Sequence, residues 1–189
     1  LLSEFARIPT INGHTHVIPE DDRLERDLDA LSYFAHPYCA ADLQSAGIDD
    51  DTLRFVVGNQ GFLALPETKQ TVAPLAERWE RFEPWWHRVR HTGFSQCLLE
   101  GWRAAYGIDG LNSETVGAIT NAIRAGRRPG HYAEVLKCMG NIQVSLMQMG
   151  GPFGEPVDDF DRELFLPVPR LNRFTMLRSR DDLTDLERE

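Results

Sequence analysis

The hydrophobic and polar positions of this chain follow two different periods. From about residue 22 to residue 139, apolar side chains recur every three to four residues, as they do along one face of an α-helix. The spacing predicts helices over 22–47 with a break at Pro37, a short helix opened by Asp49, and helices over 67–106, 112–124 and 131–139. Pro84 and Gly93 predict interruptions of the long segment 67–106.

Short segments near both ends of the chain follow the other period, which is typical of β-strands. Residues 8–13, 142–147 and 164–169 predict strands, and residues 181–189 predict the start of one more helix. The order of the elements is therefore strand, a long helical block, two strands and a helix, which indicates the α/β class with an excess of helix. The helical block far exceeds an ordinary crossover of about a dozen residues, so we interpret it as a large insertion.

The composition favours a soluble cytoplasmic protein. The 189 residues are 42% hydrophobic and 26% charged, and no apolar run approaches the roughly 20 residues that span a bilayer. A net charge of −9 disfavours nucleic acid and anionic membranes as partners and leaves a homo-oligomer open. Arginine supplies 18 of the 20 basic residues, and its planar guanidinium binds carboxylates in bidentate geometry. Three distant cysteines predict neither a disulfide scaffold nor a zinc knuckle.

The segment His14-Thr15-His16 follows the first predicted strand and is the strongest candidate for chemistry. Residues two apart on a strand point to the same side, so both imidazoles can reach one divalent metal ion. The end of a strand is also where α/β barrels carry their catalytic groups. The spacing alone leaves a pair of solvated histidines equally open.

Other candidates are weaker. His87 and His91 are four residues apart on a predicted helix, but neighbouring arginines would repel a cation, so a surface or packing role is favoured. The aromatic run 79–86 has the helical spacing of a core. Arg170 directly follows the third predicted strand, where it would either clamp a substrate carboxylate or form a surface ion pair. The absence of dinucleotide, Walker A and GxSxG motifs disfavours three large enzyme classes.

The segment Ile11-Asn12-Gly13-His14-Thr15-His16 resembles the strand-one signature of the amidohydrolase superfamily, and the layout that follows resembles its uronate isomerase-like branch. The resemblance extends through the segments 102–108, 111–115 and 135–146. It implies the N-terminal part of a (β/α)₈ TIM-like barrel with a large helical insertion after strand one. The expected division is 1–20 for barrel strand one, 21–140 for the insertion, and 141–189 for strands two and three with the next helix.

The same resemblance implies a function and a set of site residues. His14 and His16 would bind a divalent metal, expected to be zinc, while Tyr38 and Arg170 would contact a small, carboxylate-bearing substrate. The resemblance identifies no catalytic base in this chain. A complete barrel needs about 250 residues, so we expect the chain to be part of a longer enzyme and to be inactive alone.

Three functions stay open from the sequence. The first is a metal-dependent hydrolase that acts through a metal-activated water. The second is a uronate isomerase, although Gly13 and the segment 148–152 differ from the residues usual in that family. The third is a noncatalytic helical interaction module in which the two histidines have no common role.

Overall fold

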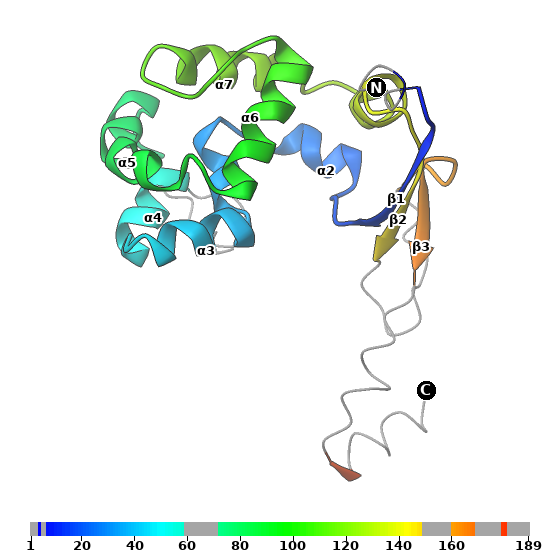
Figure 1. The fold of residues 1–189 in the computed structure, drawn as a ribbon, viewed down its shortest axis with the longest axis horizontal. Coiled ribbons are helices and arrows are strands. Elements are labelled where there is room, and N and C mark those ends of the chain that lie inside the picture. The colour runs from blue at the N-terminus through cyan, green and yellow to red at the C-terminus, as the bar shows by residue number, and fades with distance from the viewer. Residues whose placement is uncertain (1–3, 5–6, 59–71, 149–159, 169–178, 181–189) are drawn as a thin grey trace. The chain divides into compact units, whose positions relative to one another are not determined.

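A computed structural model describes residues 4, 7–58, 72–148, 160–168 and 179–180. The chain divides into two compact units, one of residues 24–128 and one that joins residues 1–23 to residues 129–189. Figure 1 shows helices in the first unit and a sheet with shorter helices in the second. Within the described ranges, every helix is too short or too polar to cross a membrane.

The unit of residues 24–128 is built from helices around one hydrophobic core. Its elements are the 3₁₀ helix η1 (Leu31–Ala35) and the α-helices α3 (Pro37–Ser45), α4 (Asp50–Val57), α5 (Leu75–Val89), α6 (Gly93–Tyr106) and α7 (Thr115–Ala125). The amphipathic spacing explains the core, because each helix buries the apolar stripe that the sequence predicts. The fully buried side chains include Leu31, Phe34, Leu43, Leu53, Val56, Val57, Phe82 and Ile119.

The predicted interruption at Pro84 is wrong, because α5 continues through this residue. Proline cannot donate to the carbonyl of the residue four positions earlier, here Glu80. Both residues are exposed, so water can satisfy that carbonyl, while Phe82 and Trp86 on the other side of the helix remain buried. The position of proline on the helix therefore decides its effect.

Local capping sets several helix ends where the sequence predicts them. Gly107 ends α6 with a left-handed φ of 68°, a conformation that costs glycine little. The Asn112 side chain accepts hydrogen bonds from the N–H groups of Glu114 and Thr115, at 2.9 and 3.0 Å, and so caps the start of α7. Gly126 follows the last residue of α7.

Asp49 caps α4 and makes a pH-dependent contribution to stability. Its carboxylate accepts from the Thr52 hydroxyl at 2.7 Å and from the Thr52 N–H at 2.8 Å, and these bonds lower the pKa of Asp49 below its ordinary value of 3.8. A lowered folded-state pKa means that the stabilisation is present above 3.8 and is lost as the pH falls through the folded value.

The Asp49→Asn variant can still cap the helix but carries no charge. We therefore expect its free energy of unfolding to fall furthest below that of the parent protein near neutral pH. Urea unfolding at a series of pH values from about 6 to about 2.5 measures the difference. The difference in free energy of unfolding between the two proteins should become smaller at the lowest pH values. A gap that does not change with pH would show that the charge of Asp49 has no role in the cap.

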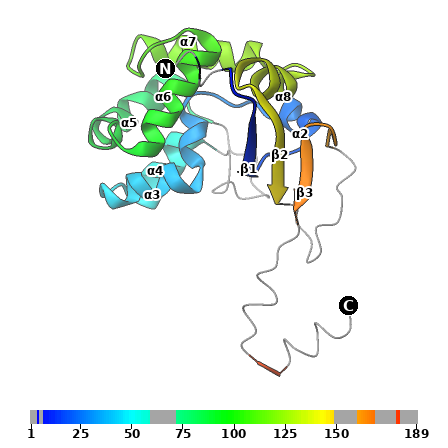
Figure 2. The same cartoon turned by 45° about the vertical axis from the view of Figure 1, so that its right-hand side comes forward.

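The second unit contains a parallel sheet with the strand order β1-β2-β3, and Figure 2 shows its three arrows running in the same direction. The strands are β1 (Thr10–Thr15), β2 (Ile142–Gln148) and β3 (Phe165–Val168). The helical segments α2 (Glu20–Glu25), α8 (His131–Ala133) and η3, a π-helix (Glu134–Met139), accompany them. Residues 67–71 of the helix predicted over 67–106, and the helix predicted over 181–189, lie outside the described residues. Residues 72–74 are not helical, because α5 begins at Leu75.

The two faces of the sheet differ in burial. One face is covered, because Met147 and Phe165 are buried in a cluster with Leu164, against which Tyr132 and Leu136 pack. Along β2 the alternate positions Val144 and Leu146 are only half-buried, and Leu166, the register partner of Leu146, is 44% exposed. Parallel sheets in proteins are normally covered on both faces, so this apolar face is less covered than is usual.

These observations confirm a mixed α/β fold with a small parallel sheet. The described strands form an open sheet and do not close a barrel within this chain. The expected division at residues 20 and 140 stays a prediction. Residues 131–139 belong to the same compact unit as the strands, because Tyr132 and Leu136 pack against the buried side of the sheet.

Candidate metal centre

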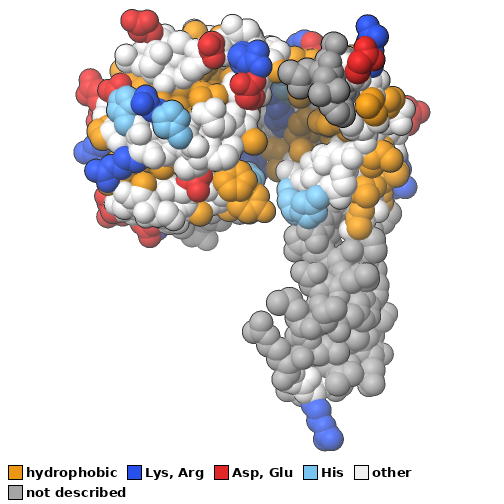
Figure 3. Space-filling view, in the orientation of Figure 1, with side chains coloured by type: hydrophobic (Ala, Val, Ile, Leu, Met, Phe, Trp, Pro, Cys, Tyr) orange, Lys and Arg blue, Asp and Glu red, His pale blue; other side chains and the backbone are white. Residues whose placement is uncertain are grey.

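His14 and His16 lie at the C-terminal end of β1 with their rings turned toward each other. The Nε2 atoms of the two imidazoles are 2.7 Å apart, and the ring centroids are separated by 4.5 Å at an interplanar angle of 82°. Both side chains are exposed, and Figure 3 shows histidine (pale blue) at the molecular surface. The two nitrogens best suited to bind a metal therefore meet at one point that solvent can reach.

The local backbone explains this arrangement. His14 and His16 flank Thr15, so the alternation of a strand turns both rings to one side. Between Asn12 and Thr15 the register shifts, because Asn12 pairs with Ser145 and Thr15 with Met147. The extra residue on β1 is a bulge, a feature that re-aims side chains beside functional sites.

Hydrogen bonds hold the backbone on both sides of the histidines. The N–H of His14 donates to the Asn12 side chain at 3.3 Å. Beyond His16, the Tyr132 hydroxyl donates to the carbonyl of Ile18 at 2.9 Å. The Glu20 carboxylate accepts from the N–H groups of Gly130 and Tyr132, both at 2.9 Å. The start of α8 thus anchors the chain that leaves the histidine pair.

The geometry of the pair fits two ligands of one metal ion. Two nitrogens on a tetrahedral zinc ion stand about 3.3 Å apart, given Zn–N bonds of about 2.0–2.1 Å. The observed separation of 2.7 Å needs only a small outward movement of two exposed rings. At this separation one ring must donate and the other accept, so a metal ion would displace the shared proton.

Two histidines by themselves do not complete a catalytic metal site. Among the residues that the structure describes, no group of three or more His, Cys, Asp or Glu side chains is placed to hold a metal ion. A catalytic zinc site uses three protein ligands. The remaining ligands would have to come from outside the described residues.

The two predicted substrate residues have different outcomes. Tyr38 lies at the start of α3 with 53% of its surface exposed, and its ring stacks on Phe94 with centroids 4.7 Å apart. The His36 ring lies 5.1 Å from Tyr38. Tyr38 belongs to the helical unit, which the structure describes separately from the unit of the histidine pair. Arg170 lies outside the described residues.

The other histidine pair has a cationic neighbour. His87 and His91 are at and just beyond the end of α5, and Arg90 donates from Nε to Nε2 of His91 at 3.1 Å. This bond uses one ring nitrogen of His91 and places a positive charge beside it. The surface role that the sequence favours for these residues agrees with this contact.

Cys39 is not placed for nucleophilic chemistry. Burial, together with the charges of Asp42 and Cys97, raises the pKa of its thiol from 9.0 to about 11. A thiol with this pKa stays protonated near neutral pH and is a poor nucleophile. The aromatic run of α5 is likewise structural, because Trp79, Phe82 and Trp86 are buried in the core.

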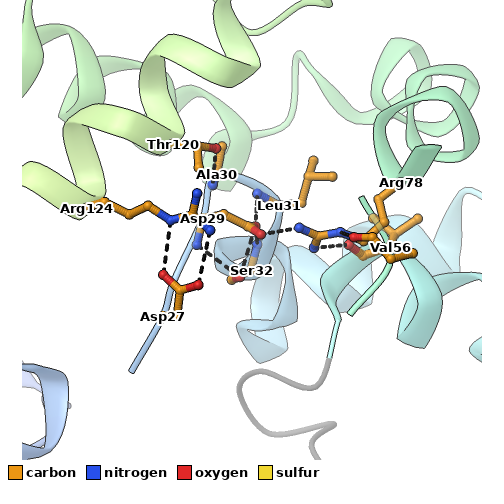
Figure 4. A network of polar contacts seen from close by, with 10 residues as sticks. Asp27, Asp29, Ala30, Leu31, Ser32, Val56, Arg78, Thr120 and Arg124 are labelled. Atoms are coloured by element: carbon orange, nitrogen blue, oxygen red, sulfur yellow. Dashed lines mark hydrogen bonds and ion pairs between the residues drawn. The ribbon is translucent and has the colours of Figure 1, made fainter. Parts of the chain in front are cut away.

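A buried ion pair in the helical unit was not predicted from the sequence. Arg78 of α5 and Asp29, just before η1, form a direct ion pair, with side-chain exposures of 3% and 7% (Figure 4). Arg78 stands on the apolar stripe of α5, four residues before Phe82. The position of a charged residue on an apolar stripe could have identified Arg78 as buried. Its partner Asp29 lies 49 residues away, and no local pattern predicts that pairing.

Backbone and side-chain groups complete the network around this pair. Asp29 Oδ1 accepts from the N–H groups of Leu31 and Ser32, at 3.0 and 2.9 Å, and from the Ser32 hydroxyl at 3.0 Å. Arg78 donates from Nη1 to the Val56 carbonyl at 3.0 Å and from Nε to the Ala73 carbonyl at 3.1 Å. The network joins η1, α4 and α5.

Comparison with known proteins adds no relative: no family model, no curated protein and no solved structure matches the chain. The resemblance noted for residues 11–16 and for the helical layout therefore remains a prediction. The geometry of His14 and His16 is the observation that bears on function.

Proposed function

We propose that this chain is the N-terminal part of a metal-dependent hydrolase of the amidohydrolase type, with His14 and His16 as two ligands of a divalent metal, expected to be zinc. The observation that carries the proposal is the 2.7 Å approach of the two Nε2 atoms at the C-terminal end of β1. Active sites of (β/α)₈ barrels form at this end of the strands.

The sheet supports the barrel part of the proposal. Consecutive parallel strands that lie side by side in the order β1-β2-β3 are how the wall of such a barrel begins. The half-buried face with Val144, Leu146 and Leu166 would be the inner face, which packs against residues of the other strands. β1 is an outer strand of the described sheet and would pair with a further strand there, while Ile11, 65% exposed, lies on the same face as its register partner Val144.

The residues of this chain would have distinct roles in the reaction. His14 and His16 would hold the metal ion, which when bound lowers the pKa of a water molecule and polarises a carbonyl group. Arg170 would bind the carboxylate of a small substrate through its guanidinium fork. The general base would come from outside the described residues.

Zinc binding tests the proposal, with the second histidine pair as a matched control. We expect His14→Ala/His16→Ala to reduce the zinc bound in equilibrium dialysis at least tenfold, because both proposed ligands are lost. His87→Ala/His91→Ala removes the same number of imidazoles and should leave zinc binding unchanged. Circular dichroism of both double variants should match the parent, since all four histidines are exposed.

The outcomes separate the three functions. Equal zinc binding by the parent and by His14→Ala/His16→Ala would exclude the metal centre and favour an interaction module. If zinc binding is lost, activity assays on the longest natural form of the protein distinguish the reactions. Hydrolysis of compounds from a panel of esters, lactones or amides would support the hydrolase. Formation of a ketose from glucuronate or galacturonate would favour the isomerase instead.

A further inference from the structure

The helical unit contains a cavity of about 330 Å³ beside the buried ion pair. Its polar lining consists of Asp27, Asp29, Arg78 and Arg124, which Figure 4 shows together. A cavity of this size is at the lower end of the range that binds small molecules. The lining carries two carboxylates and two guanidinium groups, so the kind of ligand depends on which of their atoms remain unpaired.

Arg78 has donor capacity left over. Its three hydrogen bonds to Ala73, Val56 and Asp29 use one N–H each from Nε, Nη1 and Nη2. A guanidinium carries a second N–H on each Nη atom, and in the described part of the chain these two find no acceptor. Arg78 is only 2% exposed. A buried donor without an acceptor costs free energy that a ligand oxygen would recover.

Arg124 contributes further donors from the other side of the cavity. Its Nε and Nη2 atoms donate to the two carboxylate oxygens of Asp27, at 3.0 and 3.1 Å, and this bidentate pair fixes the guanidinium plane. Nη1 takes no part in that pair. The side chain of Arg124 is 47% exposed, so a ligand can reach it from solvent.

The charge balance of the cluster favours a ligand with one negative charge. Asp27 and Asp29 face Arg78 and Arg124, and a third guanidinium, Arg127, lies 3.7 Å from Asp27. The four charged side chains that line the cavity balance one another, and Arg127, which does not line it, adds one positive charge beside Asp27. One bound carboxylate would balance that added charge.

The rest of the lining is apolar and suits the body of such a ligand. Val72, Pro74 and Leu75 form this part of the wall. From these contacts we infer that the cavity binds a small monocarboxylate, with its oxygens toward Arg78 and Arg124 and its apolar body against Val72, Pro74 and Leu75. This site is independent of the histidine pair and does not rest on the proposed hydrolase.

Benzoate and benzamide are suitable probes, because they share a shape and differ in charge. Titration calorimetry of the full chain with EDTA present, so that no metal contributes, should show saturable benzoate binding with a Kd in the millimolar range and at least tenfold weaker binding of benzamide. Arg124→Gln should weaken benzoate at least tenfold. Arg103→Gln removes an exposed arginine of α6 that does not line the cavity, and it should have no effect.

A second variant tests the cavity without changing any charge. Ala73→Phe keeps the backbone carbonyl that Arg78 uses and fills the space beside it, so it should abolish benzoate binding. Thermal unfolding confirms that each variant is folded. The inference is overturned if benzoate does not bind saturably, if benzamide binds equally well, or if folded Arg124→Gln and Ala73→Phe bind benzoate like the parent.

Discussion

Arg78→Ala is expected to lower the free energy of unfolding of the helical unit by about 3–5 kcal/mol, because it leaves Asp29 as a buried charge without its partner. The Asp29 side chain is 7% exposed, and its remaining bonds to the N–H groups of Leu31 and Ser32 do not supply the positive charge of the guanidinium. The variant also removes the donors to the carbonyls of Val56 and Ala73. Urea unfolding followed by tryptophan fluorescence measures the loss, since all four tryptophans lie in α5 and α6.

Two further variants separate the buried charge from the general loss of a side chain. Arg54→Ala removes an exposed arginine whose partner Asp51 is 96% exposed, so it should change stability by about 0.5 kcal/mol or less. Arg78→Met combined with Asp29→Asn should recover part of the loss, because no unpaired charge remains and the asparagine oxygen can still accept from the N–H groups of Leu31 and Ser32. If Arg78→Ala costs no more than Arg54→Ala, the ion pair does not stabilise the fold.

Phe82→Ala is expected to destabilise the same unit by a comparable amount, about 3–5 kcal/mol, through a cavity in the core. Phe82 is fully buried, and its ring lies 4.6 Å from that of Phe34, 5.9 Å from that of Trp79 and 6.2 Å from that of Trp86. Removing the ring takes a contact from each of these aromatic side chains. The same urea experiment measures the change.

Tyr38→Ala is the matched control for Phe82→Ala. Tyr38 also stacks on another aromatic ring, that of Phe94, but it is 53% exposed, so its removal leaves no closed cavity. We expect a loss of about 1 kcal/mol or less. A loss from Phe82→Ala as small as that from Tyr38→Ala would contradict the packing described for the core.

Much of the local structure was predictable because it depends on residues close in sequence. The Asp49 and Asn112 side chains cap helices through bonds to N–H groups two or three residues ahead. Gly107 ends α6 in a conformation that glycine favours. The alternation over 142–147 identified β2, whose observed bounds are Ile142–Gln148. For β1 the prediction of 8–13 is two residues early, and His14 belongs to the strand itself.

Some features of the candidate metal centre follow from the local sequence, and others depend on distant residues. The spacing of His14 and His16 predicts that both rings share one side of a strand. The 2.7 Å separation and the bulge between Asn12 and Thr15 depend on the pairing of β1 with β2, more than 120 residues along the chain. No local pattern encodes that register.

The sequence by itself located most of the helical and strand segments and the histidine pair, because these follow from interactions within about four residues. The helix predicted from residue 22 to Pro37 is wrong over 26–30, which separate α2 from the 3₁₀ helix η1. Only the tertiary structure decided the pairing of Asp29 with Arg78, the continuation of α5 through Pro84 and the order of the sheet. These features depend on which side of an element meets water and which distant group fills the space beside it. The physical reason is burial, which the chain acquires only when its distant parts pack together.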